Sequence, residues 1–120
     1  GDTDGDQIFL MPVQATDRII GIYRSGDALT GATDINIGLW STDSTPTDVD
    51  ENLLADAVNI ASASATWAQI DEIAVENRGK PLWSLLGGTE PTQKTYFLAL
   101  NLITAGTAAG DVALKIDFLI

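Results

Sequence analysis

The chain has 120 residues, of which 45% are apolar and 19% charged, a balance typical of a globular protein rather than of a disordered chain. Seventeen acidic residues against six basic ones give a net charge of −11, which opposes binding to nucleic-acid phosphates and to anionic membrane surfaces. Cysteine and histidine are absent, which excludes disulfides, thiolate nucleophiles, the usual zinc sites and histidine acid–base chemistry. We therefore expect one domain over residues 1–120, with no cofactor, no nucleic-acid partner and no membrane partner.

The first forty residues alternate apolar and polar side chains in short segments that end at turn-forming residues. Residues 1–6, Gly-Asp-Thr-Asp-Gly-Asp, are expected to form a flexible acidic segment. The period-two alternation then predicts strands over residues 8–13, 18–24 and 34–40. Pro12 cannot donate a backbone hydrogen bond, so we expect the first of these strands to end at this residue or to lie at a sheet edge.

The middle of the chain has a less regular pattern. Residues 41–50 are rich in Ser, Thr, Asp and Pro and are expected to form an exposed loop. The apolar spacing in residues 52–63 predicts a helical turn running into an extended piece. Residues 66–75 are expected to supply another strand. A short helix is predicted around residues 80–86, because proline opens this segment, glycine follows it and its leucines form one apolar stripe.

The last third of the chain again alternates as strands do. Strands are predicted over residues 96–104 and 112–120, joined by a hairpin connection over residues 105–110, Ala-Gly-Thr-Ala-Ala-Gly. Seven or eight short strands with turns at this spacing are typical of two packed antiparallel sheets. The expected fold is therefore all-β, an antiparallel β-sandwich or jelly roll with one short helix around residues 80–86.

The N-terminal acids resemble the start of a calcium-binding loop, because Asp2, Asp4 and Asp6 alternate. Such a loop needs Gly at its sixth position and Glu at its twelfth, where this chain has Gln7 and Val13. The helix–loop–helix interpretation therefore fails. A looser calcium site at one end of a sandwich stays open beside the favoured alternative, a solvated and mobile terminus.

Two further acidic clusters could supply the carboxylate pair of a glycosidase. The first lies in a Ser/Thr-rich loop, where carboxylates usually just face solvent, and the second has two basic residues close enough to neutralise it. The plentiful serines lack a Gly-x-Ser-x-Gly elbow and a histidine base, so we expect no enzyme and no catalytic residue. The two clusters are Asp43, Asp48, Asp50 and Glu51, and Asp71, Glu72 and Glu76 with Arg78 and Lys80.

The aromatic residues are the better candidates for a binding site. Trp40, Trp67 and Trp83, with Tyr23 and Tyr96, could line a platform for a sugar, as in carbohydrate-binding sandwiches. The alternative is core packing, which is favoured for Trp83 because it lies among leucines. Trp40 ends a predicted strand before a loop, where it could contact a partner at the rim of the domain.

Several segments give the chain a family likeness. They are residues 15–22 (Ala-Thr-Asp-Arg-Ile-Ile-Gly-Ile), 34–40 (Asp-Ile-Asn-Ile-Gly-Leu-Trp), 79–87 (Gly-Lys-Pro-Leu-Trp-Ser-Leu-Leu-Gly) and 104–110 (Thr-Ala-Gly-Thr-Ala-Ala-Gly). With them the chain resembles the small cement, or decoration, proteins of tailed-bacteriophage capsids and related jelly-roll phage proteins.

The resemblance implies a structural virion protein without catalytic residues. Such a protein binds the major capsid protein on the capsid exterior, bridges neighbouring subunits and stabilises the shell, often as a homodimer or homotrimer. The alternative function is a carbohydrate- or receptor-binding β-sandwich module of a phage tail fibre or similar appendage.

Overall fold

The computed structural model describes residues 6–28, 34–88, 94–104 and 112–119, and most of them belong to β-strands. The all-β sandwich predicted from the sequence is confirmed. Asp6 already belongs to the first strand, while residues 1–5 and the predicted connection over 105–110 lie outside the described residues. The elements are β1 Asp6–Gln14, β2 Ile19–Gly26, β3 Asp34–Ser41, β4 Asp48–Val58, β5 Ser64–Gln69, η1 Val75–Asn77, α1 Leu82–Leu85, β6 Thr95–Thr104 and β7 Val112–Phe118.

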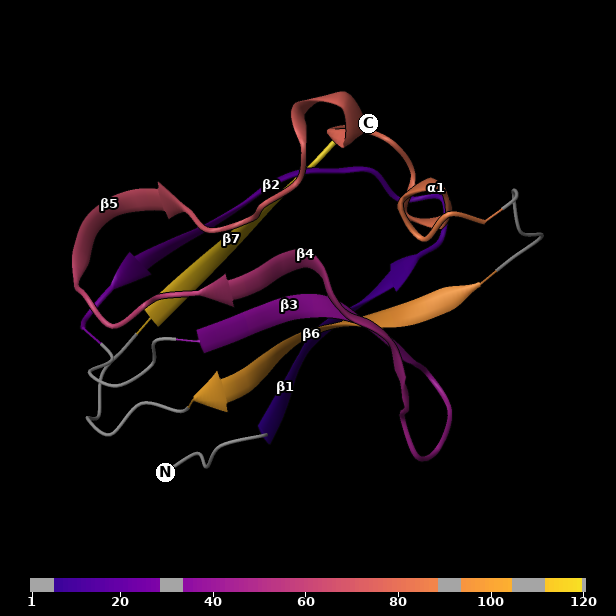
Figure 1. Cartoon of the computed structure of the whole chain (residues 1–120), viewed down its shortest axis with the longest axis horizontal. Helices are drawn as coiled ribbons and strands as arrows, with labels where there is room; N and C mark the ends of the chain where they lie inside the picture. The colour runs from indigo at the N-terminus through magenta and orange to yellow at the C-terminus, as the bar shows by residue number, and fades with distance from the viewer. Residues whose placement is uncertain (1–5, 29–33, 89–93, 105–111, 120) are drawn as a thin grey trace.

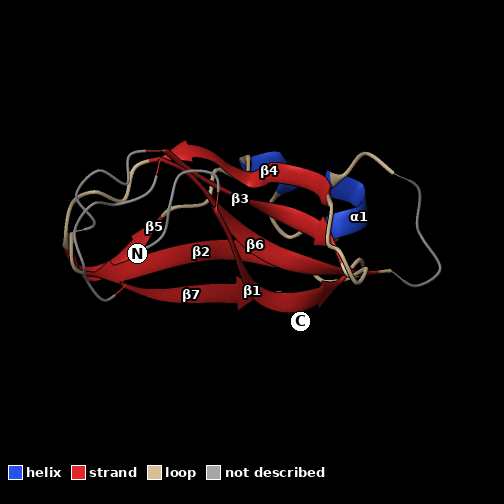
Figure 2. Cartoon of the chain, turned by 90° about the horizontal axis from the view of Figure 1, so that it is seen from below, coloured by secondary structure: helices blue, strands red, loops and turns tan. Residues whose placement is uncertain are grey.

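The strands form two antiparallel sheets (Figures 1 and 2). The four-stranded sheet has the order β1-β6-β3-β4, and the three-stranded sheet has the order β5-β2-β7. A jelly roll has eight strands in two four-stranded sheets, whereas the described strands form one sheet of four and one of three. The described strands therefore match the predicted β-sandwich. β1 is an edge strand, as Pro12 indicated, and its register shifts at a bulge between Phe9 and Met11.

The core lies between the two sheets and is built from the alternating residues of the strands. On β3 and β6 every second residue points inward, which places the apolar members of each alternation against the other sheet. Leu82 of α1 joins them from one end of the sandwich. The largest fully buried side chains are Ile19, Ile22, Ile35, Ile37, Leu39, Leu54, Leu82, Leu98 and Val13.

β4 corrects two expectations. It runs through residues 52–58, where a helical turn was predicted, and it begins at Asp48, so the exposed loop is shorter than residues 41–50. The helical expectation failed because β4 bulges by several residues: one residue of β3 separates Ile37 from Leu39, while four residues of β4 separate their partners Ala55 and Asp50. A bulge breaks the period-two alternation, so apolar residues fall at spacings that also fit a helix.

The short helix was predicted in the right place but is only one turn long. Its first residues are held against the β1–β2 connection, since the Leu82 N–H donates to the Asp17 carbonyl and the Trp83 N–H to the Ala15 carbonyl. Leu82 is fully buried, whereas Trp83 and Leu85 pack against the core and are only partly buried. In the described part of the chain, no helix is long and apolar enough to span a membrane.

The strand predicted over residues 66–75 ends earlier, at Gln69. The Ile70 N–H still donates to the Ile22 carbonyl of β2. Beyond Ile70 the chain leaves the sheet, because the side chain of Asp71 takes over the next backbone donor of β2. The segment then turns through η1 towards α1.

Candidate functional site

The outer face of the four-stranded sheet carries three aromatic rings, which we call the aromatic cluster: Phe9 of β1, Trp40 of β3 and Phe97 of β6. The Phe9 and Phe97 ring centroids lie 5.3 Å apart, and those of Phe9 and Trp40 lie 6.0 Å apart in an edge-to-face arrangement. Phe9 remains 44% exposed. The outer face of an antiparallel sandwich is usually polar, so a cluster of rings that includes an exposed one is a candidate contact surface.

Strand register explains how these rings meet. Phe97 lies in the middle of a cross-strand row, between Pro12 on β1 and Trp40 on β3. Phe9 lies in a neighbouring row opposite Ala99, whose small side chain leaves space beside it. The Phe9 ring can therefore reach across β6 to Trp40.

Acidic residues lie on one side of the aromatic cluster, on the edge strand β4. The four strands of this sheet contain six acidic residues and neither lysine nor arginine, with four of the acids in β4 and one each in β1 and β3. Asp48 is exposed and pairs directly with Trp40. In contrast, the strands of the other sheet contain Arg24, Lys115 and a single acid, Asp117. The charge of the strands is thus segregated between the two sheets.

Glu51 of the acidic β4 strand has a structural role. Its carboxylate accepts a hydrogen bond from Asn101 Nδ2 at 2.7 Å across the outer face of the sheet. Asn36, the cross-strand partner of Asn101, accepts from the Ala57 N–H at 2.9 Å. Between these contacts the backbone of β4 passes close over Gly38. β4 is therefore fixed against the outer face of β3 and β6 at three points.

The outer face of the three-stranded sheet has a different character. The Lys115 ammonium lies 4.8 Å from the centre of the Tyr23 ring and 5.4 Å from that of Trp67. A cation over an aromatic ring is attracted by its π electrons. Trp67 is 47% exposed, so this face also offers an aromatic surface, but one that already holds a cation of its own.

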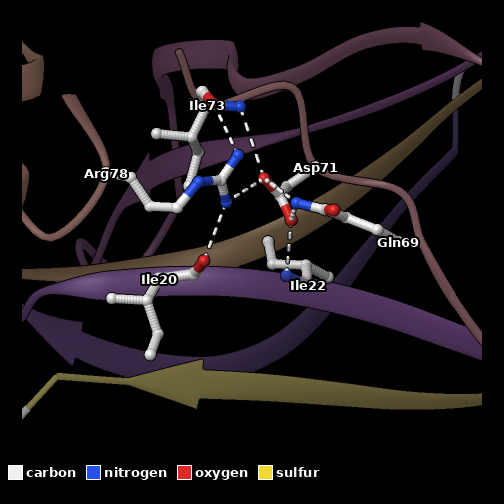
Figure 3. A network of polar contacts seen from close by, with 6 residues as sticks. All are labelled: Ile20, Ile22, Gln69, Asp71, Ile73 and Arg78. Atoms are coloured by element: carbon white, nitrogen blue, oxygen red, sulfur yellow. Dashed lines mark hydrogen bonds and ion pairs between the residues drawn. The ribbon is translucent and has the colours of Figure 1, made fainter. Parts of the chain in front are cut away.

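The side chain of Asp71 is fully buried and forms the centre of a polar network (Figure 3). Its carboxylate accepts hydrogen bonds from the Ile22 N–H at 2.8 Å, from Gln69 Nε2 at 3.0 Å and from the Arg78 guanidinium at 2.8 Å. Arg78 also donates to the carbonyls of Ile20 and Ile73. The network fastens the segment between β5 and α1 to β2, and it is closed by partners within the chain.

These contacts determine the pKa of Asp71. Burial alone raises the pKa of Asp71, but the hydrogen bonds from Ile22, Arg78 and Gln69, together with the charge of Arg78, outweigh it. The pKa therefore lies below its usual value. These contacts favour the ionised form of the carboxylate and join it to β2 and to the segment before α1.

Glu72 and Glu76, predicted together with Asp71 as a possible carboxylate pair, have surroundings different from those of Asp71. Glu72 accepts from the Asp56 N–H at 2.6 Å, and Glu76 lies exposed in η1. Lys80, which was expected to neutralise this cluster, donates to Asn77 instead, while Arg78 does pair with Asp71. Over the described ranges, no group of three or more acidic residues is arranged to hold a metal ion.

The five aromatic residues considered for a sugar platform do not share a face. Tyr96 is 8% exposed and belongs to the core, and Trp83 packs at α1. Trp40 lies on the outer face of one sheet, and Tyr23 and Trp67 lie with Lys115 on the outer face of the other. Sequence reasoning missed Phe9 and Phe97. Their signal was the phase of the alternation, since Phe97 lies opposite in phase to the buried Tyr96 and Leu98.

A hollow of about 430 Å³ lies beside β1 and the end of β7, lined by Met11, Thr16, Asp17, Arg18, Phe118 and Leu119. Its charged side chains already have partners, since Asp17 accepts from the Gln14 N–H and Arg18 donates to the Gly79 carbonyl. The aromatic cluster with its acidic surroundings is therefore the stronger candidate site.

We compared the chain with known proteins. No protein-family model, no curated protein and no solved structure matches the chain.

Proposed function

We propose that this chain is a non-catalytic structural protein that docks onto a larger protein assembly through the outer face of its four-stranded sheet. The observation that carries the proposal is the aromatic cluster, in which Phe9 stays 44% exposed on a face that is normally polar. The assembly proposed is the capsid of a tailed phage, with the major capsid protein as the partner. The resemblance to cement proteins supports the choice of assembly, and the geometry supports the choice of face.

The form of the domain suits this role. Aromatic residues are enriched in protein–protein interfaces, where a large rigid side chain gives much contact area for little lost conformational freedom. A small sandwich that contacts several capsid subunits on the exterior adds interface area without changing their fold. Assembly of the chain into a dimer or trimer multiplies these contacts and raises the avidity.

The direct test compares phage particles assembled with and without this chain. We expect particles that carry the chain to retain their DNA to a higher temperature, because the added contacts oppose separation of the capsid subunits. Release of DNA can be followed with an intercalating dye during slow heating. Particles that carry no copies of the chain, or that release DNA at the same temperature with and without it, would contradict the proposal.

A second candidate function is favoured by Trp67, which is 47% exposed beside Tyr23 on the other sheet. These two rings suit stacking against a sugar in a carbohydrate- or receptor-binding module. Lys115 would have to move away from both rings before a sugar could stack on them. A broad glycan screen in which the indole N–H signal of Trp67 stays unchanged in ¹⁵N NMR spectra would remove this candidate.

A further inference from the structure

We infer that the partner surface recognised by the aromatic cluster is a folded protein surface with an apolar centre and a basic margin. The inference rests on the proposed function, because it names the chemistry of the partner that docks on the same face. It excludes a second copy of this chain as the occupant of that face. The observations that carry it are the segregation of charge between the sheets and the position of the acids relative to the rings.

The strands of the two sheets differ in charge. The strands of the four-stranded sheet contain six acids and no base. All six basic residues of the chain therefore lie outside these four strands. A partner that approaches this face meets a negative potential, which attracts a basic surface and repels an acidic one.

Exposed acids lie beside the aromatic cluster. Trp40 and Phe97 are neighbours in one cross-strand row, and the exposed Asp48 continues that row on the edge strand β4. Asp56 is also exposed on β4. Trp40 and Phe97 thus lie on the inner strands β3 and β6 and Phe9 on the edge strand β1, while the exposed acids lie on the opposite edge strand β4. An interface commonly has a polar rim beside its apolar part, and the β4 acids form such a rim on one side of the rings.

The same charges argue against a second copy. A symmetric pairing through this face would bring together two surfaces whose strands contain acids and no base, so the charges of these strands would repel each other. A homodimer or homotrimer of this chain would therefore form through other surfaces. The partner on the aromatic cluster must carry the opposite charge.

Three short peptides can probe this chemistry without knowledge of the natural partner. The first carries three leucines between four lysines, the second replaces the lysines with glutamates, and the third replaces the leucines with serines. The chain has three tryptophans, so the three indole N–H signals in an ¹⁵N NMR spectrum report separately on its surfaces. Trp40 reports on the aromatic cluster, Trp67 on the opposite sheet and Trp83 on α1.

We expect the lysine–leucine peptide to shift the Trp40 indole signal and the amides of β3 and β4, and to leave Trp67 and Trp83 unchanged. The glutamate peptide should not bind, and the serine peptide should bind weakly. Asp48→Lys should weaken binding about tenfold at low salt, whereas Asp117→Lys, the matched change on the outer face of the other sheet, should have little effect. Both variants change the net charge by the same amount, so the comparison separates location from total charge.

Several results would overturn the inference. They are a lysine–leucine peptide that binds at Trp67 or nowhere, equal weakening by Asp48→Lys and Asp117→Lys, equal binding of the glutamate peptide, or concentration-dependent self-association that shifts Trp40. The peptide experiment and the particle experiment can fail independently of each other. If the chain protects particles but the Trp40 signal does not shift with the basic peptide, only the partner chemistry is rejected. If the Trp40 signal shifts but the particles are not protected, only the capsid role is rejected.

Discussion

Gly38→Ala is expected to destabilise the domain by about 3 kcal/mol, because the new methyl group would enter space already filled by the backbone. A Cβ atom at this position would lie 2.0 Å from the Asp50 carbonyl oxygen and 2.6 Å from that of Glu51. No rotamer change can relieve this contact, since the opposing atoms are main-chain atoms of β4. Chemical denaturation followed by tryptophan fluorescence measures the loss.

Two other glycines give matched controls for this prediction. A Cβ atom at Gly88 would meet its nearest neighbour at 3.5 Å, an ordinary contact, so Gly88→Ala should leave stability nearly unchanged. At Gly21 the Cβ would meet the end of the Tyr23 side chain at 2.6 Å, which can rotate away, so the cost should be intermediate. A Gly38→Ala variant as stable as Gly88→Ala would show that β4 does not lie over β3 as described.

Asp71→Asn is expected to destabilise the domain by about 3 kcal/mol, since it removes the buried carboxylate of a partly buried ion pair together with several of its hydrogen bonds. The Arg78 guanidinium would lose its carboxylate at 2.8 Å, and an amide cannot accept all the hydrogen bonds that the carboxylate accepts. Asp17→Asn is the matched control. Asp17 accepts one backbone hydrogen bond in a turn, so its replacement should cost about 1 kcal/mol.

The pH dependence gives a second readout of the same network. The pKa of Asp71 is lower in the folded chain than its ordinary value of 3.8, so its contribution is fully present above that value. The contribution is lost as the pH falls through the folded pKa. The difference in unfolding free energy between the parent and Asp71→Asn should therefore be constant near neutral pH and shrink below about pH 4. A difference that stays constant into strong acid would contradict the assigned role.

Arg78→Gln tests the cause of the lowered pKa. Without the guanidinium, burial of Asp71 is opposed by fewer hydrogen bonds and by no charge, so its pKa should rise. The acid-induced loss of stability should then begin at a higher pH than in the parent. An unchanged acid profile in Arg78→Gln would show that this ion pair does not control the ionisation of Asp71.

Most of the fold was predictable because the strands obey simple alternation. The inward residues of β3 and β6 are every second residue, and this pattern placed both strands within one or two residues of their observed bounds. β4 was not predictable in this way, because its bulge moves Leu54 and Ala55 inward together. Such a bulge depends on contacts with Gly38 and Asn36, which are distant in sequence.

The candidate site was only partly predictable. Trp40 was identified as a possible partner contact, because it ends a strand. Phe9 and Phe97 can be recognised as site residues only from the strand order β1-β6-β3, which brings three separate segments together on one face. Alternation assigns a residue to a face of its own strand, but it does not say which strands become neighbours. The charge segregation was hidden for the same reason.

The most direct test of the docking face is the number of copies bound to purified particles for the parent, Phe9→Ser and Trp67→Ser. These two residues are matched, since Phe9 is 44% exposed and Trp67 is 47% exposed on opposite sheets. Both variants should fold, because each removes only contacts of about 1 kcal/mol or less apiece, two ring contacts for Phe9 and a cation–π contact for Trp67. We expect Phe9→Ser to lose most bound copies and Trp67→Ser to retain the parental number. Full occupancy by Phe9→Ser together with loss of Trp67→Ser would place the docking surface on the other sheet and contradict the account.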